Sequence, residues 1–130
     1  MDDESSLVVV LNSNKELEYF RNRPLSKKQT EDLIKIDSKL ALGFEISGQL
    51  MSQPSEKDKA TYIANMLIGA LINDNESIMS LCCSFLATRF TELKQVRATT
   101  HDDHYTIRLI YDQEFVEQNT VQFVNKKDLN

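Results

Sequence analysis

The sequence contains few of the residues that interrupt regular structure or build cofactor-binding loops. Its 130 residues include three glycines, two prolines, two cysteines and no tryptophan. Glycine and proline mark most turns, so their scarcity predicts long helices and strands with few breaks. The scattered glycines also form neither a P-loop nor a G-x-G-x-x-G sequence, the two common loops that cradle phosphates. We therefore expect no cofactor.

Cysteine and histidine are also too scarce for a metal or nucleophilic site. Cys82 and Cys83 are adjacent, which directs their side chains apart, so we expect buried, reduced thiols. His101 and His104 are the two histidines, whereas a zinc site typically takes three or four protein ligands. No G-x-S-x-G sequence provides an activated serine. The sequence thus predicts neither a metal site nor a catalytic residue, which favours a protein that is not an enzyme.

A secretory signal, a membrane-spanning run and a surplus of positive charge are missing as well. The chain opens with acidic residues instead of a basic and apolar leader, so a cytoplasmic location is expected. The most apolar stretch, Ile63–Ile72, is far shorter than the roughly 20 residues that span a bilayer. The formal net charge of −5 disfavours binding to nucleic acid or to an anionic membrane.

What the chain does contain is the composition of a globular domain. Hydrophobic residues make up 41% and charged residues 27% of the sequence. That content and length suffice for a core without disulfides or metals. We expect one α+β domain over residues 1–130, in which residues 1–5 form a flexible acidic N-terminus.

The N-terminal half predicts one strand and two helices. Leu7–Leu11 is a continuous apolar run, typical of a strand that is covered on both faces and lies inside a sheet. Ser13 followed by Glu16 fits a capping box and predicts a short helix that stops before Pro24. Apolar residues at helical spacing then predict a long helix over roughly Ser26–Ser52.

The C-terminal half predicts two more helices followed by strands. A helix over Ser55–Ile72 is apolar almost all round, and another extends over about Glu76–Leu93. The apolar period then changes from helical to alternating over Gln95–Tyr111, which predicts a hairpin. Thr120–Val124 is expected to form a further strand.

Together these elements predict an α+β fold. The C-terminal strands form a three-stranded meander that accepts the N-terminal strand, which gives a four-stranded and largely antiparallel sheet. One short helix and three longer helices form a layer on one face of that sheet.

The register of the predicted hairpin follows from its apolar pattern, because the apolar residues of both strands must share one face. Pairing Thr100 with Tyr105 places every large apolar residue on that face. The opposite face then carries four pairs, which are His101 with His104, Thr99 with Thr106, Arg97 with Arg108, and Gln95 with Ile110.

The opposed arginines form a candidate binding site for an anion or a partner. Like charges directly across a ladder are mildly destabilising, so a compensating group is expected. One explanation is a neighbouring carboxylate, namely Asp112, Glu114 or Glu117. The other is an external anion, either a phosphate or an acidic segment of a partner, with the histidine pair adding positive charge at lower pH.

Two further surfaces are candidates for contacts with other molecules. Gly43 and Gly48 are unfavourable inside a helix, so they indicate close approach of another backbone or a bend. This segment and a row of small hydroxyl residues predict a partner-helix interface made of Leu42, Gly43, Ile46, Ser47, Leu50, Ser77, Ser80, Ser84 and Thr88. The basic cluster consists of Arg21, Arg23, Lys27 and Lys28, which is small for a nucleic-acid footprint.

The sequence favours a non-enzymatic, intracellular protein–protein interaction module, such as a regulatory protein, an inhibitor, or a subunit or assembly factor of a complex. Its partner is expected to be another protein or a second copy of the chain. Two alternatives stay open. One is a small enzyme or anion-binding protein that uses the polar hairpin face of Arg97, Arg108, His101 and His104. The other is a nucleic-acid-binding accessory protein that uses the basic cluster.

Overall fold

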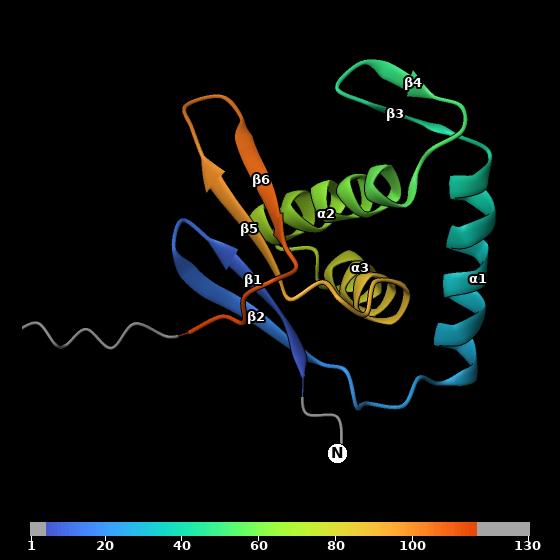
Figure 1. Ribbon diagram of the computed structural model, residues 1–130, viewed down its shortest axis with the longest axis horizontal. Coiled ribbons are helices and arrows are strands. Elements are labelled where there is room, and N and C mark those ends of the chain that lie inside the picture. Colours follow the sequence, from blue (N-terminus) through green and yellow to red (C-terminus); the bar gives the residue numbers. More distant parts are fainter. Residues whose placement is uncertain (1–4, 117–130) are drawn as a thin grey trace, which may run out of the picture.

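Three helices and six short strands make up residues 5–116, the part of the chain that the computed structural model describes (Figure 1). In chain order they are β1 (Ser6–Leu11), β2 (Asn14–Phe20), α1 (Lys27–Ala41), β3 (Phe44–Ile46), β4 (Gln49–Met51), α2 (Glu56–Ile72), α3 (Glu76–Arg89), β5 (Gln95–Thr100) and β6 (Tyr105–Ile110). The strands form a four-stranded sheet and a separate β3–β4 hairpin.

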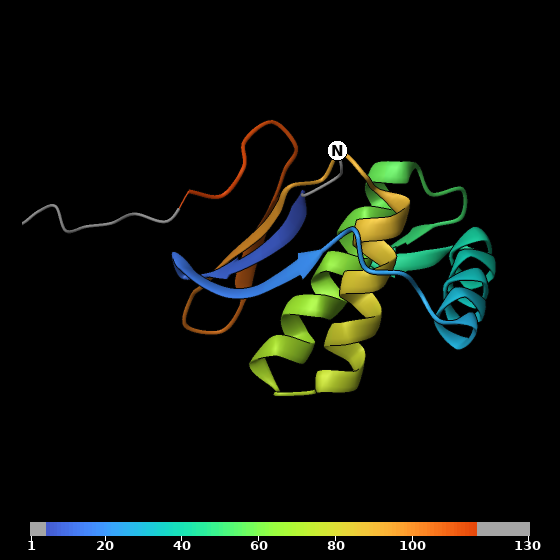
Figure 2. The same ribbon diagram turned by 90° about the horizontal axis from the view of Figure 1, so that it is seen from below.

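The four-stranded sheet is mixed and not largely antiparallel, so the predicted fold class was wrong on this point. Its order is β2-β1-β5-β6, with β1 and β5 parallel and both outer strands antiparallel to their neighbours. An apolar pattern shows which face a strand buries, but not the direction of the neighbouring strand. The parallel pair needs a long crossover, and all three helices lie within it. Helices α2 and α3 cover one face of the sheet, and α1 packs outside α3 (Figure 2).

Strand β1 lies inside the sheet, as predicted. Leu7 and Val9 face the helices and join the main core, which includes Phe85 of α3. Val8 and Val10 alternate with them and are also buried, on the face turned away from the helices. This second face is the outer face of the sheet.

The short helix predicted after Ser13 was wrong, because residues 14–20 form the edge strand β2. Asn12 and Ser13 have positive φ angles of 51° and 72° and make the two-residue turn between β1 and β2. Leu17 and Tyr19 then point to the core at the two-residue spacing of a strand. A segment this short fits both the helical and the strand periodicity. It forms a strand because β1 provides a hydrogen-bond partner.

The long helix predicted over Ser26–Ser52 was wrong beyond Ala41, where α1 ends. The following residues form the β3–β4 hairpin, whose turn is Ser47–Gly48. Gly43 has a φ of 97°, and a Cβ at this position would lie 2.7 Å from the carbonyl oxygen of Met51. Glycine alone fits that conformation and contact, so Gly43 ends the helix.

Helices α2 and α3 confirm the two central helices of the prediction. Ser55 caps α2 through a reciprocal capping box with Asp58, at 3.1 and 3.0 Å. Asn75 caps α3, which ends at Arg89, before the predicted end near residue 93. Within residues 5–116, no helix is both long enough and apolar enough to cross a bilayer.

The β5–β6 hairpin confirms the predicted register. Thr100 lies opposite Tyr105, and Arg97 lies opposite Arg108. The predicted strand Thr120–Val124 and residues 1–4 lie outside the described residues.

Candidate functional site

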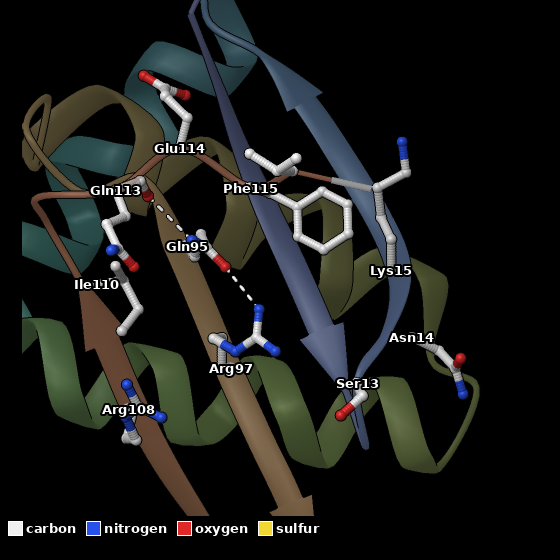
Figure 3. Close-up of a pocket in the computed structure, with 11 residues that line it drawn as sticks. Ser13, Asn14, Lys15, Gln95, Arg97, Arg108, Ile110, Gln113, Glu114 and Phe115 are labelled. Atoms are coloured by element: carbon white, nitrogen blue, oxygen red, sulfur yellow. Dashed lines mark hydrogen bonds between the residues drawn. The ribbon is translucent and has the colours of Figure 1, made fainter. Parts of the chain in front are cut away.

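The outer face of the sheet contains an open pocket of about 990 Å³ around the predicted arginine pair (Figure 3). Residues from the β1–β2 turn, β2, β5 and β6 contribute to it, together with residues 113–116, which follow β6. It is lined by Ser13, Asn14, Lys15, Gln95, Arg97, Arg108, Ile110, Gln113, Glu114, Phe115 and Val116. Because these residues come from distant parts of the chain, the pocket exists only once the mixed sheet has formed.

Arg97 is half-buried and is oriented by a chain of hydrogen bonds (Figure 3). Its Nη1 donates to Gln95 Oε1 at 2.8 Å, and Gln95 Nε2 donates to the carbonyl oxygen of Gln113 at 2.9 Å. Gln95 is only 4% exposed. An amide carries no charge, so these hydrogen bonds hold the Arg97 guanidinium in place without neutralising its charge.

The Arg108 side chain is exposed and has no hydrogen bond or ion pair with any residue from 5 to 116. Of the carboxylates predicted to compensate the arginine pair, Glu114 instead pairs with Lys94 at 3.3 Å. Asp112 is exposed and forms no ion pair with either arginine in the described part of the chain. Glu117 lies outside the described residues. The predicted internal compensation is therefore not seen among the carboxylates that are described.

Lys15 adds a third positive charge to the pocket. Its Nζ lies 3.1 Å from Glu18 Oε1 and 5.9 Å from the centre of the Phe115 ring. The Ser6 hydroxyl donates to Glu18 at 2.8 Å, and this bond, followed by the contact with Lys15, lowers the pKa of the Glu18 carboxyl. The pocket lining thus has three cations and one carboxylate. Glu114 pairs with Lys94 and Lys15 pairs with Glu18, so the two arginines carry the charge that has no carboxylate partner among the described residues. The result is a positive site on an acidic protein.

Hydroxyl groups surround the arginines on the remaining side. A smaller cavity of about 170 Å³ adjoins Arg97 and Arg108 and is also lined by Ser13, Thr99 and Thr106. Hydroxyls donate and accept hydrogen bonds, so they suit a carboxylate or phosphate oxygen placed beside the guanidinium groups.

The predicted histidine pair lies beyond the arginines at the tip of the hairpin. The rings of His101 and His104 stack with 4.6 Å between their centres and an angle of 19°. His104 Nδ1 lies 2.7 Å from Asp103 Oδ1, and His101 Nε2 lies 3.4 Å from Thr106 Oγ1. Neither histidine lines the pocket. In the described range, no three side chains of the metal-binding types come together.

The first group of predicted partner-helix residues does not lie on a helix. These residues follow α1 and lie either between it and β3 or in the β3–β4 hairpin, namely Leu42, Gly43, Ile46, Ser47 and Leu50. Leu42 is 84% exposed and Leu50 66% exposed. Whether they contact a second copy or another partner stays a prediction.

The hydroxyl row of α3 is divided between solvent and the sheet. Ser77 and Ser80 are exposed, whereas Ser84 is buried and donates to the Tyr19 hydroxyl of β2 at 3.3 Å. Thr88 is half-buried. Strand β2 therefore contacts the C-terminal part of this row, and the N-terminal part remains open for the predicted interface.

One residue of the basic cluster, Arg21, has a structural role. The Arg21 guanidinium donates to three backbone carbonyl oxygens at the C-terminal end of α3, those of Ala87, Phe90 and Leu93. A cation at this end also interacts favourably with the helix dipole. Lys28 forms an ion pair with Asp32 at 3.3 Å. These contacts reduce the charge that the cluster presents to nucleic acid.

The predicted buried thiols are confirmed. Cys82 is 2% exposed and Cys83 4% exposed, and both are free. Burial raises the pKa of both thiols to about 12, with the neighbouring Cys83 adding to the shift at Cys82. A thiol that holds its proton this firmly is a poor nucleophile.

Most lining residues of the pocket were not predicted as site residues, among them Lys15, Phe115 and Gln95. Lys15 was placed in a helix, and Phe115 follows β6 without a pattern that indicates its position. Gln95 is two residues from Arg97, so strand alternation puts both side chains on one face. The predicted register therefore already indicated that Gln95 lies beside Arg97.

Comparison with known proteins finds no family model, curated protein or solved structure that matches this chain.

Proposed function

We propose that the protein is a non-enzymatic interaction module whose outer sheet face binds an acidic segment of a partner protein. The observation that supports this proposal is the arginine pair, in which Arg108 lies opposite Arg97 without a described carboxylate partner. Opposed like charges lower stability. A carboxylate supplied by a partner would offset that repulsion and form the strong, bidentate bonds that guanidinium groups favour.

The spacing of the cations favours an extended chain over a single small anion. The Arg97 guanidinium points along β5 towards Gln95, apart from that of Arg108 on β6, and Lys15 lies on the far side of β1 (Figure 3). Sites for a single phosphate usually converge backbone N–H groups at a helix N-terminus or a glycine-rich nest. The lining residues of this pocket come from strands and their connections. An acidic chain can reach cations that are separated in this way.

The test is binding of a fluorescent peptide of about eight glutamates, measured by anisotropy at low ionic strength. We expect affinity that falls with added salt and drops about tenfold or more in Arg108→Gln, because a charged contact contributes roughly 1.5–3 kcal/mol. Lys28→Gln is the matched control, since it removes one positive charge from an ion pair outside the pocket.

Two outcomes would contradict the proposal. One is no binding at low salt. The other is an equal loss of affinity in Arg108→Gln and Lys28→Gln, which indicates attraction to net charge without a specific site.

A further inference from the structure

Strand β6 is an edge of the described sheet and lacks the features that usually protect an edge. Proteins block exposed edges with charges, prolines or bulges. The opposite edge strand, β2, carries three charged residues and pairs with β1 through a register shift between Val9 and Val10. In contrast, β6 has one charge, no proline and an unbroken register with β5. Among residues 5–116, the sheet is thus protected at one edge and open at the other.

The open edge presents backbone groups at Ile107 and Leu109. The carbonyl oxygens of Lys94 and Ala98 accept hydrogen bonds from the β1 side. Alternation therefore directs the backbone groups of Arg108 towards β5 and those of its neighbours Ile107 and Leu109 towards the open edge. Within residues 5–116, the N–H and C=O groups of these two neighbours have no hydrogen-bond partner.

The two faces beside this edge differ in chemistry. On the helix side lies an open groove of about 940 Å³, in which the apolar residues Phe90, Ile107, Leu109 and Tyr111 lie among charged lining residues, namely Glu56, Lys57, Arg89, Glu92 and Arg108. On the outer side, Arg108 projects into the positive pocket. Side chains of a strand alternate between the two faces of a sheet. A strand beside β6 would therefore meet Ile107 and Leu109 on the helix side and, on the outer side, Arg108 between Thr106 and Ile110.

We propose that the partner binds by adding an extended segment to the edge of β6, with alternating apolar and acidic side chains. This inference rests on the proposed function and specifies how the acidic segment is bound. The backbone of the segment bonds to Ile107 and Leu109, its apolar side chains enter the groove, and its carboxylates reach Arg108. Main-chain bonds then provide affinity and the two faces provide specificity, as in other cases of strand addition.

A second copy of this chain is a poorer occupant of the edge. Two β6 strands paired about a twofold axis would bring Arg97 and Arg108 of both copies onto one outer face. The sequence of β6 contains no acidic residue that could offset this charge. An acidic strand from another protein removes the repulsion, and this complementarity decides between the two occupants.

The experiment compares capped peptides of about seven residues with the full-length, isotope-labelled protein. In one peptide glutamate and valine alternate, and in its control the same residues are arranged in two blocks. A third peptide alternates glutamate with serine. Amide hydrogen exchange of Ile107 and Leu109 is followed by NMR during each titration.

We expect the alternating glutamate–valine peptide to bind about tenfold or more tightly than either other peptide, because it alone combines strand pairing with apolar burial. It should also slow exchange of the Ile107 and Leu109 amides about tenfold or more. Strand addition would be overturned if all three peptides bound with equal affinity and did not change amide exchange. If that binding still depended on Arg108, the proposed function would stand. Slow exchange of both amides before any peptide is added would also overturn strand addition, since the edge is then already paired. If no peptide binds, the proposed function fails as well.

Discussion

Arg97 and Arg108 face each other across β5 and β6, and neither forms an ion pair with a residue from 5 to 116. Gln95 holds Arg97 through a neutral hydrogen bond of 2.8 Å. Arg97 therefore has a fixed position, and no described carboxylate compensates the charge of the pair. That combination is unfavourable for the isolated fold and favourable for binding a carboxylate.

Removing the charge at Arg108 should stabilise the free protein. We expect Arg108→Gln to raise the free energy of unfolding by about 0.5 kcal/mol, because the repulsion across the ladder is lost and no ion pair is broken. Urea denaturation at low ionic strength provides the measurement. Lys28→Gln should leave stability unchanged or lower it slightly, since Lys28 pairs with Asp32. A clear destabilisation by Arg108→Gln would indicate an internal partner for Arg108 and count against a binding role.

Arg21 should matter for folding and not for binding at the outer face. Arg21→Gln removes charged hydrogen bonds to the C-terminal end of α3. We expect it to lower the free energy of unfolding by about 2 kcal/mol. Arg23→Gln is the control, because Arg23 is exposed and contacts the Tyr19 ring at 5.7 Å, a contact that contributes about 0.5–1 kcal/mol. Equal effects of the two substitutions in thermal or urea unfolding would contradict the assigned role of Arg21.

The two glycines near the β3–β4 hairpin should differ in their tolerance of alanine. Both have positive φ angles, 97° at Gly43 and 78° at Gly48. Gly48→Ala should cost about 1 kcal/mol for backbone conformation alone, since a Cβ there meets nothing within 4 Å. Gly43→Ala should cost about 2 kcal/mol or more, because its Cβ also clashes with the Met51 carbonyl. Thermal denaturation of both variants measures the difference, and a larger loss at Gly48 would contradict the described turn.

The turn that begins β2 should accept glycine at Ser13. Ser13 has a φ of 72°, a conformation that costs a side-chain-bearing residue more than glycine. We expect Ser13→Gly to raise the free energy of unfolding by about 0.5 kcal/mol. The same substitution at Ser38, an exposed site within α1, should lower it by about 0.5 kcal/mol. Loss of stability at both sites would favour the helix first predicted after Ser13.

The buried thiols should make the fold sensitive to alkaline pH. In the unfolded chain thiols ionise near pH 8.5, whereas burial raises the pKa of Cys82 and Cys83 to about 12. Between these values the unfolded state binds fewer protons, so the free energy of unfolding falls as pH rises, by up to about 1.4 kcal/mol per pH unit for each thiol. The Cys82→Ala/Cys83→Ala variant should show a shallower decline above pH 9 in urea titrations. Parallel declines in both proteins would show that other groups cause the effect.

The sequence alone determined the β5–β6 hairpin and its polar face. Two adjacent strands that alternate in the same way have one register that buries all their apolar residues, so Thr100 opposite Tyr105 also placed Arg97 opposite Arg108. The start of α2 was determined in the same local manner, because a capping box needs only Ser55 and Asp58. Both features depend on contacts between residues that are near one another in the chain.

Only the tertiary structure decided the remaining elements of the site. Residues 14–20 form a strand because β1 offers them hydrogen bonds, and that strand brings Lys15 to the pocket. The parallel pairing of β1 with β5 joins segments far apart in the chain. It leaves β6 at the edge of the described sheet and forms the C-terminal side of the pocket. Arg21 likewise finds the end of α3 only after folding. Local periodicity does not encode such partners, because their energy depends on which distant surfaces meet.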